Sequence, residues 1–325
     1  MLQPVNSDYS TKDDENKGYN GSSDKPIYLT DVSPKDKPWD IHRAQAQIIE
    51  LLYRTSKVFE KYASRIGNCT GNLGFIWDID QETGERKLKL KEARFCRVRY
   101  CPVCQWRRSL MHKARFYQIL PSILEREPNA QWLFLTLTVA NIPITELRST
   151  LQEMNKAWHR LVKRKAFRPI LGWIRSTEVT RSQDSKAHPH FHALLLVKPS
   201  YFKNNYISQE KWVKLWQESL RVDYKPIVDV RRAKGDSKTI AEALKYSIKP
   251  DDLTSDADWL IELTCQTYKL RFISTGGILK DAIKEFERSE KDLLLAKDEK
   301  DLDPNRDPDL WFDWQRIEKR YKKRD

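Results

Sequence analysis

The sequence predicts an α+β fold in which helices pack on an antiparallel sheet, and three observations lead to this prediction. Between residues 131 and 280, short β-rich runs alternate with segments of helical periodicity. Two of those runs are separated only by a short polar loop, as expected for paired neighbouring strands. Ahead of them, four of the five cysteines fall between residues 69 and 104. We therefore expect a small cysteine module followed by a layer of strands covered by helices.

The first predicted elements are a helix and a hairpin. Residues 41–66 predict one amphipathic helix, because apolar side chains recur there at roughly helical spacing. These side chains are Ile48, Leu51, Leu52 and Val58. Residues 73–79 and 87–95 predict a hairpin that follows the first cysteine.

The later part of the chain supplies the predicted sheet. Its strands are expected at residues 132–139, 173–180, 190–197 and 227–230. The polar loop 181–188 joins the second of these strands to the third. Helices are expected at residues 145–165, 209–221 and 238–248.

Composition narrows the class of partner. The 325 residues suffice for one large domain or two modest ones. Lys and Arg number 59 against 46 Asp and Glu, a net charge of +13, which favours an anionic partner and above all a nucleic acid. No apolar run approaches the ~20 residues of a membrane span, and the N-terminus lacks the pattern of a signal peptide. The uneven spacing of the cysteines argues against disulfides and for the reducing cytoplasm.

Composition also predicts the domain boundaries. Residues 1–38 are polar and are expected to be a disordered tail. Residues 39–125 would hold a helix and the cysteine module, and residues 130–285 would hold the sheet with its helices. Residues 286–325 are mostly charged and are predicted to form a helical tail that docks loosely or binds a partner. The apolar residues of that tail are Trp311, Phe312 and Trp314.

The clustered cysteines predict a structural zinc site, so the module is expected to bind zinc. Four thiolates in a tetrahedral arrangement are the ligands of such a site. His112 could replace the most distant cysteine, and buried free thiols are the alternative to any metal. Cys265 stands alone and is expected in the core. The four predicted ligands are Cys69, Cys96, Cys101 and Cys104.

The cysteine segment is also strongly basic. Residues 91–115 contain eight Lys or Arg and one acidic residue, with aromatic side chains between them. Arg and aromatic side chains on a rigid surface suit contacts with phosphates and bases, although a solvated helix face is the alternative. The predicted DNA contacts are Arg97, Arg99, Arg107 and Arg108.

Three of the six histidines lie within residues 188–192. Alternate side chains of a strand point to the same face, so His190 and His192 can present two imidazoles together while Phe191 packs on the other face. Two imidazoles on one strand form half of a site for a divalent metal. A polar strand edge or a chance cluster is the alternative.

The helix expected over residues 238–248 carries another candidate group. Glu242 and Tyr246 are four residues apart and share a face, with Lys245 and Lys249 alongside. A tyrosine can attack a phosphodiester if its hydroxyl is deprotonated or if a metal polarises the phosphate. Taken alone, such a pair is more often purely structural.

Several motifs together resemble a known family. Three segments follow the order of the three motifs of HUH endonucleases, most closely those of single-tyrosine rolling-circle replication initiators of small bacterial plasmids. The three segments are residues 134–139, 188–192 and 245–249. Residues 95–104 and 271–277 also resemble that branch. The resemblance covers roughly residues 65–285 and implies an HUH endonuclease domain over residues 130–285.

The resemblance implies a role for each candidate residue. His190 and His192 would ligate Mg²⁺ or Mn²⁺, with Glu178 of the neighbouring strand as a third ligand. Tyr246 matches the nucleophile that cuts one strand of the origin and stays attached to the 5′ phosphate. Glu242 matches the carboxylate that activates water for a closing cleavage.

The resemblance also implies a setting and partners. A bacterial cytoplasmic nicking and joining enzyme would bind plasmid origin DNA as duplex and as single-stranded hairpin, with Lys245 and Lys249 among its contacts. A host helicase and polymerase would act next. Two alternatives stay open. One is a single-tyrosine HUH transposase or mobilisation relaxase, and the other is a non-enzymatic zinc-dependent DNA-binding protein, which would leave the paired histidines unused.

Overall fold

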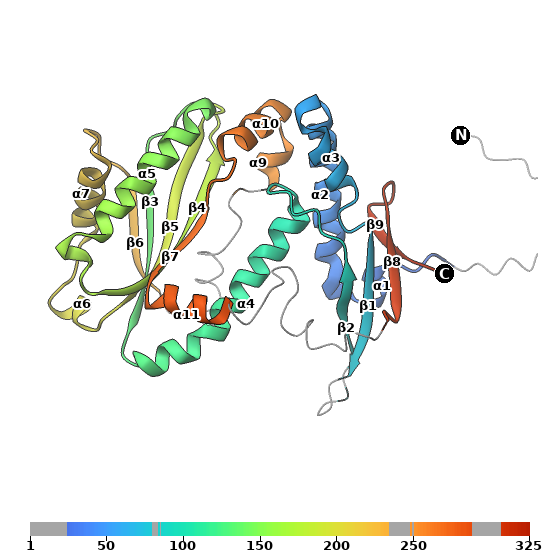
Figure 1. The fold of residues 1–325 in the computed structure, drawn as a ribbon, viewed down its shortest axis with the longest axis horizontal. Coiled ribbons are helices and arrows are strands. Elements are labelled where there is room, and N and C mark those ends of the chain that lie inside the picture. Colours follow the sequence, from blue (N-terminus) through green and yellow to red (C-terminus); the bar gives the residue numbers. More distant parts are fainter. Residues whose placement is uncertain (1–24, 80–83, 85, 234–247, 249, 288–306) are drawn as a thin grey trace, which may run out of the picture.

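Two antiparallel sheets with helices packed on them make up the structure (Figure 1). The smaller sheet has the strand order β2-β1-β8-β9 and the larger sheet the order β6-β3-β5-β4-β7. Every neighbouring pair of strands runs antiparallel, so the predicted α+β fold is confirmed. The computed structural model describes the chain over residues 25–79, 84, 86–233, 248, 250–287 and 307–325.

The smaller sheet, the first helices and the start of the helix that follows them form what we call the N-terminal module, the described residues of 28–108 together with residues 310–323. Its helical elements are α1 (Leu29–Val32), η1 (Pro34–Asp36), α2 (Lys37–Arg54), η2 (Lys57–Phe59) and α3 (Glu60–Gly67). Its strands are β1 (Asn72–Ile79), β2 (Arg86–Ala93), β8 (Leu310–Gln315) and β9 (Arg320–Lys323). The predicted hairpin corresponds to β1 and β2. Helix α4 (Pro102–Arg126) runs from this module toward the larger sheet (Figure 1).

The single helix predicted over residues 41–66 is in fact two helices, because the chain turns at η2 between α2 and α3. Of the four apolar side chains that predicted this helix, Leu52 packs against the core, whereas Leu51 is 54% and Val58 81% exposed. Helix α2 has apolar side chains on two faces, and the face with the large aromatic residues Trp39 and Tyr53 packs inward. Aromatic side chains bury the largest apolar area, so they decide the orientation of the helix.

The C-terminal tail predicted as a helix forms a β-hairpin over residues 310–323. Strand β8 pairs with β1, and Phe312 lies opposite Leu73. Phe312 and Trp314 are buried at alternate positions, which is the period of a strand. The helical prediction fails because the alternation is short and is flanked by charged residues, so it gives only a weak strand signal. The strand becomes stable only when β8 pairs with β1.

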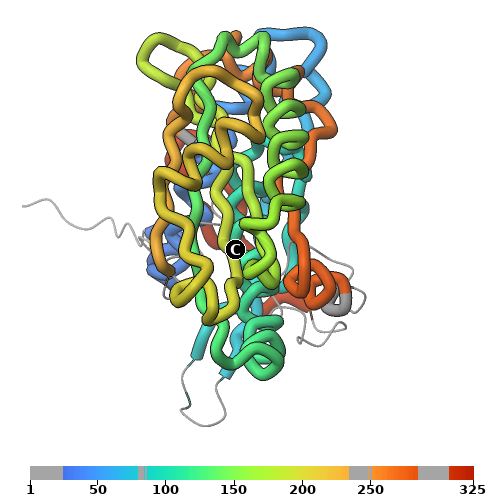
Figure 2. The backbone as a smooth tube through the Cα atoms, turned by 90° about the vertical axis from the view of Figure 1, so that its left-hand side faces the viewer, coloured from blue at the N-terminus to red at the C-terminus, as the bar shows by residue number. Residues whose placement is uncertain are grey.

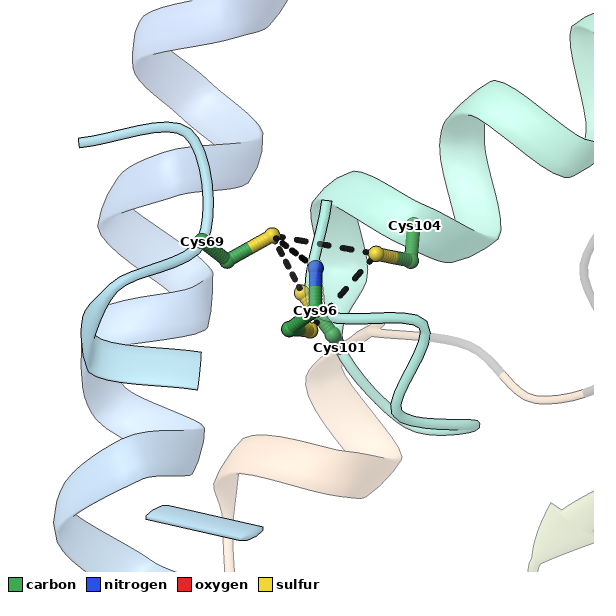
Figure 3. Close-up of side chains that lie close together, drawn as sticks. All are labelled: Cys69, Cys96, Cys101 and Cys104. Atoms are coloured by element: carbon green, nitrogen blue, oxygen red, sulfur yellow. Dashed lines mark hydrogen bonds between the residues drawn. The ribbon is translucent and has the colours of Figure 1, made fainter. Parts of the chain in front are cut away.

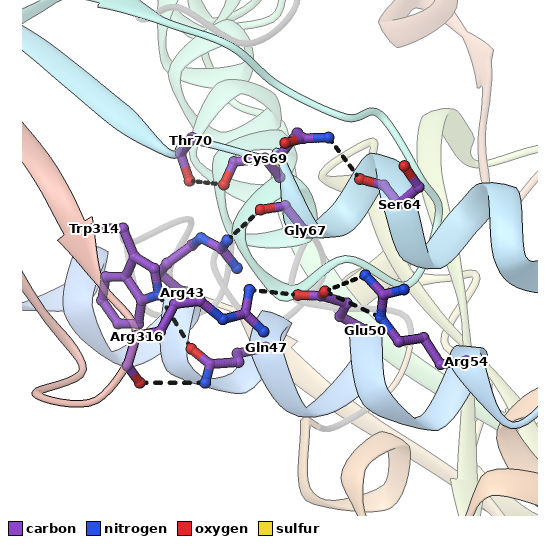
Figure 4. A network of polar contacts seen from close by, with 11 residues as sticks. Arg43, Gln47, Glu50, Arg54, Ser64, Gly67, Cys69, Thr70, Trp314 and Arg316 are labelled. Carbon is purple, nitrogen blue, oxygen red and sulfur yellow. Dashed lines mark hydrogen bonds and ion pairs between the residues drawn. The ribbon is translucent and has the colours of Figure 1, made fainter.

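Part of the tail predicted as disordered over residues 1–38 is ordered against the same hairpin. The backbone N–H of Lys323 donates to the Ile27 carbonyl at 2.8 Å. The turn of the hairpin is attached to α2, where Arg316 Nη1 lies 3.0 Å from Glu50 Oε2 (Figure 4). The two ends of the described chain therefore stabilise each other.

The larger sheet contains the four strands predicted between residues 132 and 230. They are β3 (Gln131–Thr138), β4 (Ile170–Arg181), β5 (Ala187–Val197) and β6 (Val228–Ala233), and β7 (Ile273–Gly277) is added at the edge. Its principal helices are α5 (Leu147–Val162), α7 (Gln209–Leu220) and α11 (Ile278–Glu287). The shorter helical elements are η3 (Ile144–Glu146), η4 (Lys165–Phe167), α6 (Ser200–Lys203), α9 (Pro250–Thr254) and α10 (Ala257–Gln266).

Two apolar cores hold the larger sheet between its helices. Helices α5 and α7 lie side by side over one face (Figure 2), where Trp158 and Trp216 pack against Phe191. Helices α4 and α11 cover part of the other face through Phe116 and Leu279. The helix predicted over residues 238–248 lies, apart from its last residue, outside the described residues. Among the described helices, none is long and apolar enough to cross a membrane.

The attachment of the C-terminal hairpin can be tested at Tyr321. This side chain is fully buried, and its hydroxyl donates to the Thr70 carbonyl at 2.7 Å, next to Cys69. Tyr321→Phe should lower the free energy of unfolding by about 1–3 kcal/mol, because it leaves a buried carbonyl without its donor. Urea denaturation measures this change, and Tyr206→Phe, at a side chain 61% exposed, is the control. Equal stability of the two variants would contradict the assigned bond.

Candidate functional site

Four cysteine sulfurs face one another inside the N-terminal module (Figure 3). Cys69 follows α3, Cys96 follows β2, and Cys101 and Cys104 lie at the start of α4. The Sγ atom of Cys69 lies 3.7 Å from those of Cys101 and Cys104, and the Sγ atoms of Cys96 and Cys104 are 3.6 Å apart. Zinc–sulfur bonds of about 2.3 Å in a tetrahedron place the sulfurs about 3.8 Å apart. The cluster is therefore compatible with a zinc ion.

Backbone N–H groups point at these sulfurs. The N–H of Cys96 donates to Cys69 Sγ at 3.4 Å, and the N–H of Arg97 donates to Cys104 Sγ at 3.3 Å. Arg97 has a φ of +58°, in the left-handed region, and this conformation turns the chain around the cluster. Such N–H donors stabilise negative charge on sulfur, as a metal-bound thiolate requires.

The buried sulfurs cannot all ionise without a compensating cation. Burial raises the pKa of the Cys101 thiol, whereas hydrogen bonding from Cys101 lowers the pKa of Cys104. A divalent cation would remove this conflict, because it binds all the thiolates at once. The metal-compatible group contains Cys69 and not His112. Cys265 is exposed on α10, so its predicted place in the core is wrong.

A second metal-compatible group lies on the larger sheet. The pairing of β4 with β5 places Glu178 opposite His190 and Ser176 opposite His192. Glu178 Oε2 lies 3.2 Å from His190 Nε2 and 2.8 Å from His192 Nε2. All three side chains are buried. The structure thus brings together the carboxylate and the two imidazoles that the sequence and the resemblance single out.

Both imidazole rings are also held through their other nitrogen. His192 Nδ1 lies 3.1 Å from Thr136 Oγ1, and His190 Nδ1 lies 3.2 Å from the His188 carbonyl oxygen. A carbonyl only accepts, so His190 must carry its proton on Nδ1 for this bond to form. The Nε2 lone pair of His190 then faces Glu178 and is available to a metal ion.

The arginines predicted to contact DNA lie in two different environments. Arg97 is exposed, and Arg108 Nη2 donates to its carbonyl at 3.0 Å. Arg99 stacks over Phe272, with its guanidinium 4.8 Å from the ring centroid. Arg107 is only 6% exposed and lies over two tryptophan rings of the module. Arg107 therefore contributes to packing, and the structure gives no support to a DNA contact there.

The predicted residues of the 238–249 segment lie outside the described residues. They are Tyr246, Glu242, Lys245 and Lys249. Conversely, sequence reasoning missed Thr136, which supports an imidazole, and Arg175, a charged residue in the buried interior of β4. The signal for Thr136 was its strand position, since it alternates with apolar residues, but only the pairing of β3 with β5 places it opposite His192.

The fold and its two clusters define a class, a basic α+β protein with a four-cysteine module and a histidine–carboxylate group compatible with a divalent metal. Within that class, the chain belongs to the replication protein family, which it matches over residues 87–322. This match confirms the replication family that the motifs indicate.

Individual relatives agree with this membership. The chain is 34% identical to protein rep of Streptococcus pneumoniae serotype 2 over 86% of its own length and 90% of the relative's. It is 35% identical to protein rep of Lentilactobacillus hilgardii, over 82% of this chain and 88% of that one. It is 31% identical to a replication protein of Staphylococcus aureus, over 60% of this chain and 91% of the relative. No solved structure matches the chain.

The cysteine cluster predicts that Cys101→Ser will lose zinc and stability together. Removing one thiolate weakens the metal site, and loss of a structural metal is among the changes that cost about 4 kcal/mol or more. Elemental analysis and urea denaturation would measure both effects. Cys265→Ser, at an exposed cysteine, should change neither quantity. Full zinc content with unchanged unfolding in Cys101→Ser would exclude the structural zinc site.

The contact between Thr136 Oγ1 and His192 Nδ1 predicts that the Thr136 hydroxyl contributes to metal binding. Thr136→Val keeps the shape of the side chain but removes the partner of His192 Nδ1, and we expect about 10- to 100-fold weaker Mn²⁺ binding. Calorimetric titration would measure the affinity. Thr138→Val is the matched control, because the Thr138 hydroxyl donates to the Ile227 carbonyl and not to an imidazole. Equal affinities of the two variants would remove Thr136 from the site.

Proposed function

We propose that this replication protein initiates plasmid rolling-circle replication by a metal-dependent nick in one strand of the origin. The observation that carries the proposal is the approach of both His190 Nε2 and His192 Nε2 to one buried oxygen of Glu178. These side chains would hold Mg²⁺ or Mn²⁺, which when bound polarises a phosphate. Membership of the replication protein family favours an initiator over a transposase or a mobilisation relaxase.

Tyr246 is the nucleophile in this proposal. Its phenolic oxygen attacks the scissile phosphorus, and the bond from phosphorus to the 3′ oxygen breaks. The 3′ oxygen takes up a proton and becomes a free hydroxyl, while the 5′ phosphate remains on Tyr246. Lys245 and Lys249 would favour the phenolate. Glu242 would later take a proton from water for the closing cleavage.

The N-terminal module would bind origin DNA, as duplex and as single-stranded hairpin, through exposed or half-buried cations such as Arg97, Arg99 and Arg108. A host helicase and polymerase would then use the free 3′ hydroxyl in the bacterial cytoplasm. A non-enzymatic zinc-dependent DNA-binding protein would need the cysteine cluster alone. It would leave the buried histidine–carboxylate group without a use.

Replacing both His190 and His192 by Ala tests the metal-dependent nick. The nicking rate should fall on the order of 10³-fold or more, because a bound metal stabilises the transition state by several kcal/mol. A gel assay with a labelled origin hairpin and Mn²⁺ measures the rate, and wild-type protein without divalent metal is the control. Duplex origin binding, followed by mobility shift, should remain. Nicking at the wild-type rate by the double variant would refute the assignment.

Separate variants of Tyr246 and Glu242 test the two chemical steps. Tyr246→Phe should form no covalent DNA adduct, because it lacks the nucleophilic oxygen. Glu242→Ala should still form the adduct but fail to terminate, so replication products would exceed one plasmid length. Denaturing gels of the adduct and of the products measure both outcomes. Tyr268→Phe, at an exposed tyrosine, should behave as wild type. An adduct in Tyr246→Phe would assign the nucleophile to another tyrosine.

A further inference from the structure

A cavity of about 1210 Å³ is lined by α4, α5, the strands β4 and β7, and α11. The described residues that line it include eight Arg or Lys and no Asp or Glu, although the chain has 46 acidic residues against 59 basic ones. These cations come from separate segments, among them Arg97 of the N-terminal module, Arg271 before β7 and Lys280 of α11. Such a one-sided charge indicates an anionic ligand.

Arg175 of β4 is the most buried of these cations, at 3% exposure. Its guanidinium lies 3.8 Å from the centroid of the Phe191 ring, and Nη2 donates to Asn155 Oδ1 at 2.6 Å. Its Nε and Nη1 have no hydrogen-bond partner among the described residues. Burial lowers the pKa of Arg175 to about 9, so the side chain is still a cation at neutral pH. A buried cation with two unused donors is suited to an anion.

Further unused donors lie beside this guanidinium. Ser274 of β7 pairs in register with Arg175, so the two side chains share a face of the sheet. Ser274 Oγ is buried and has no partner among the described residues. The same holds for Nε1 of Trp158, whose ring centroid lies 5.3 Å from the guanidinium. Side chains from β4, β7 and α5 that line this cavity therefore have buried hydrogen-bond donors without a described partner. Such donors are suited to an oxyanion.

The cavity also extends toward the histidine–carboxylate group. Ser176 lines the cavity and pairs in register with His192. Successive side chains of β4 point to opposite faces, so Arg175 and Ser176 approach the cavity from the two sides of the sheet. Both residues pair with β7, which is the edge strand of the larger sheet among the described strands. A ligand that follows this edge could contact Arg175 and still approach His192.

We propose that this cavity binds the phosphodiester backbone of single-stranded DNA beside the scissile bond, with one phosphate held by Arg175 and Ser274. The proposal rests on the proposed function in taking DNA as the anion. The burial of Arg175 favours a single strand, because an extended backbone can enter a groove that a rigid duplex cannot. The exposed side chains of Arg271 and Lys280 would hold the neighbouring phosphates.

The exposed side chains of Arg271 and Lys280, which we call the rim of the cavity, are tested with the double variant Arg271→Gln and Lys280→Gln. Its affinity for a labelled single strand of arbitrary sequence, measured by fluorescence anisotropy without divalent metal, should be about tenfold lower at low salt. The slope of log affinity against log salt should fall by about 0.7 for each phosphate that the variant no longer neutralises. The control is Arg168→Gln with Lys214→Gln, two exposed cations outside the cavity, which should bind as wild type. Equal affinity of the two double variants would overturn the proposal.

The buried phosphate contact is tested with inorganic phosphate as the probe. Phosphate should raise the melting temperature of the wild-type protein and have less effect on Ser274→Ala or Arg175→Gln. Ser274→Ala keeps this test valid if Arg175→Gln does not fold. The oligonucleotide should reduce the phosphate effect by competition. Equal phosphate effects in all proteins would refute the Arg175 contact, and phosphate binding without competition would assign the pocket to a free anion.

The same measurements test the cavity assignment independently of the proposed nicking activity. Binding is followed without metal and without origin sequence, so it does not depend on cleavage. A wild-type protein that binds the strand through the rim but never nicks an origin would sink the proposed function and leave the cavity assignment intact. If the wild-type protein nicks the origin normally while the rim and control variants bind the single strand equally well, the cavity assignment is refuted and the proposed function stands.

Discussion

Strands β4 and β5 are paired in a register that places Glu178 opposite His190, and the arrangement of the larger sheet depends on this register. Side chains alternate along a strand, so a slip of one residue would turn Glu178 toward α5 and α7 and away from the imidazoles. Apolar side chains on both faces oppose such a slip. Phe191 packs on the face of α5 and α7, and Leu194 packs on the face of α4 and α11. The core therefore determines where the polar group lies.

The N-terminal module is coupled to this sheet through the chain next to its cysteines. Tyr100 and Thr267 share a hydrogen bond of 2.6 Å between their hydroxyls, and Arg99 Nη2 donates to the Leu270 carbonyl at 2.5 Å. Residues 267–272 lead directly into β7, which lines the cationic cavity. The sulfur cluster thus positions one wall of the cavity as well as its own module. These hydrogen bonds therefore connect the fold of the module to the position of that wall.

The net charge of the chain indicates a binding surface only when the positions of the charged side chains are known. The surplus of +13 is spread along the chain, yet the described residues that line one cavity include eight cations and no acidic residue. Some of the other cations are used in packing or are paired. Arg107 lies inside the module, and Arg54 and Arg316 both contact Glu50 (Figure 4). Charge runs in a sequence therefore identify the class of partner and not the surface that binds it.

The sequence by itself determined the features that depend on local periodicity. The strand period puts His190 and His192 on one face, and the cysteine spacing predicts a cluster; the structure contains both. Only the tertiary structure decided features that need pairing between distant segments. The pairing of β1 with β8 makes the C-terminal residues a hairpin, and the pairing of β4 with β7 brings Ser274 beside Arg175. Short strands are stable only when paired, and no local pattern identifies a partner more than 200 residues away, as between Leu73 and Phe312.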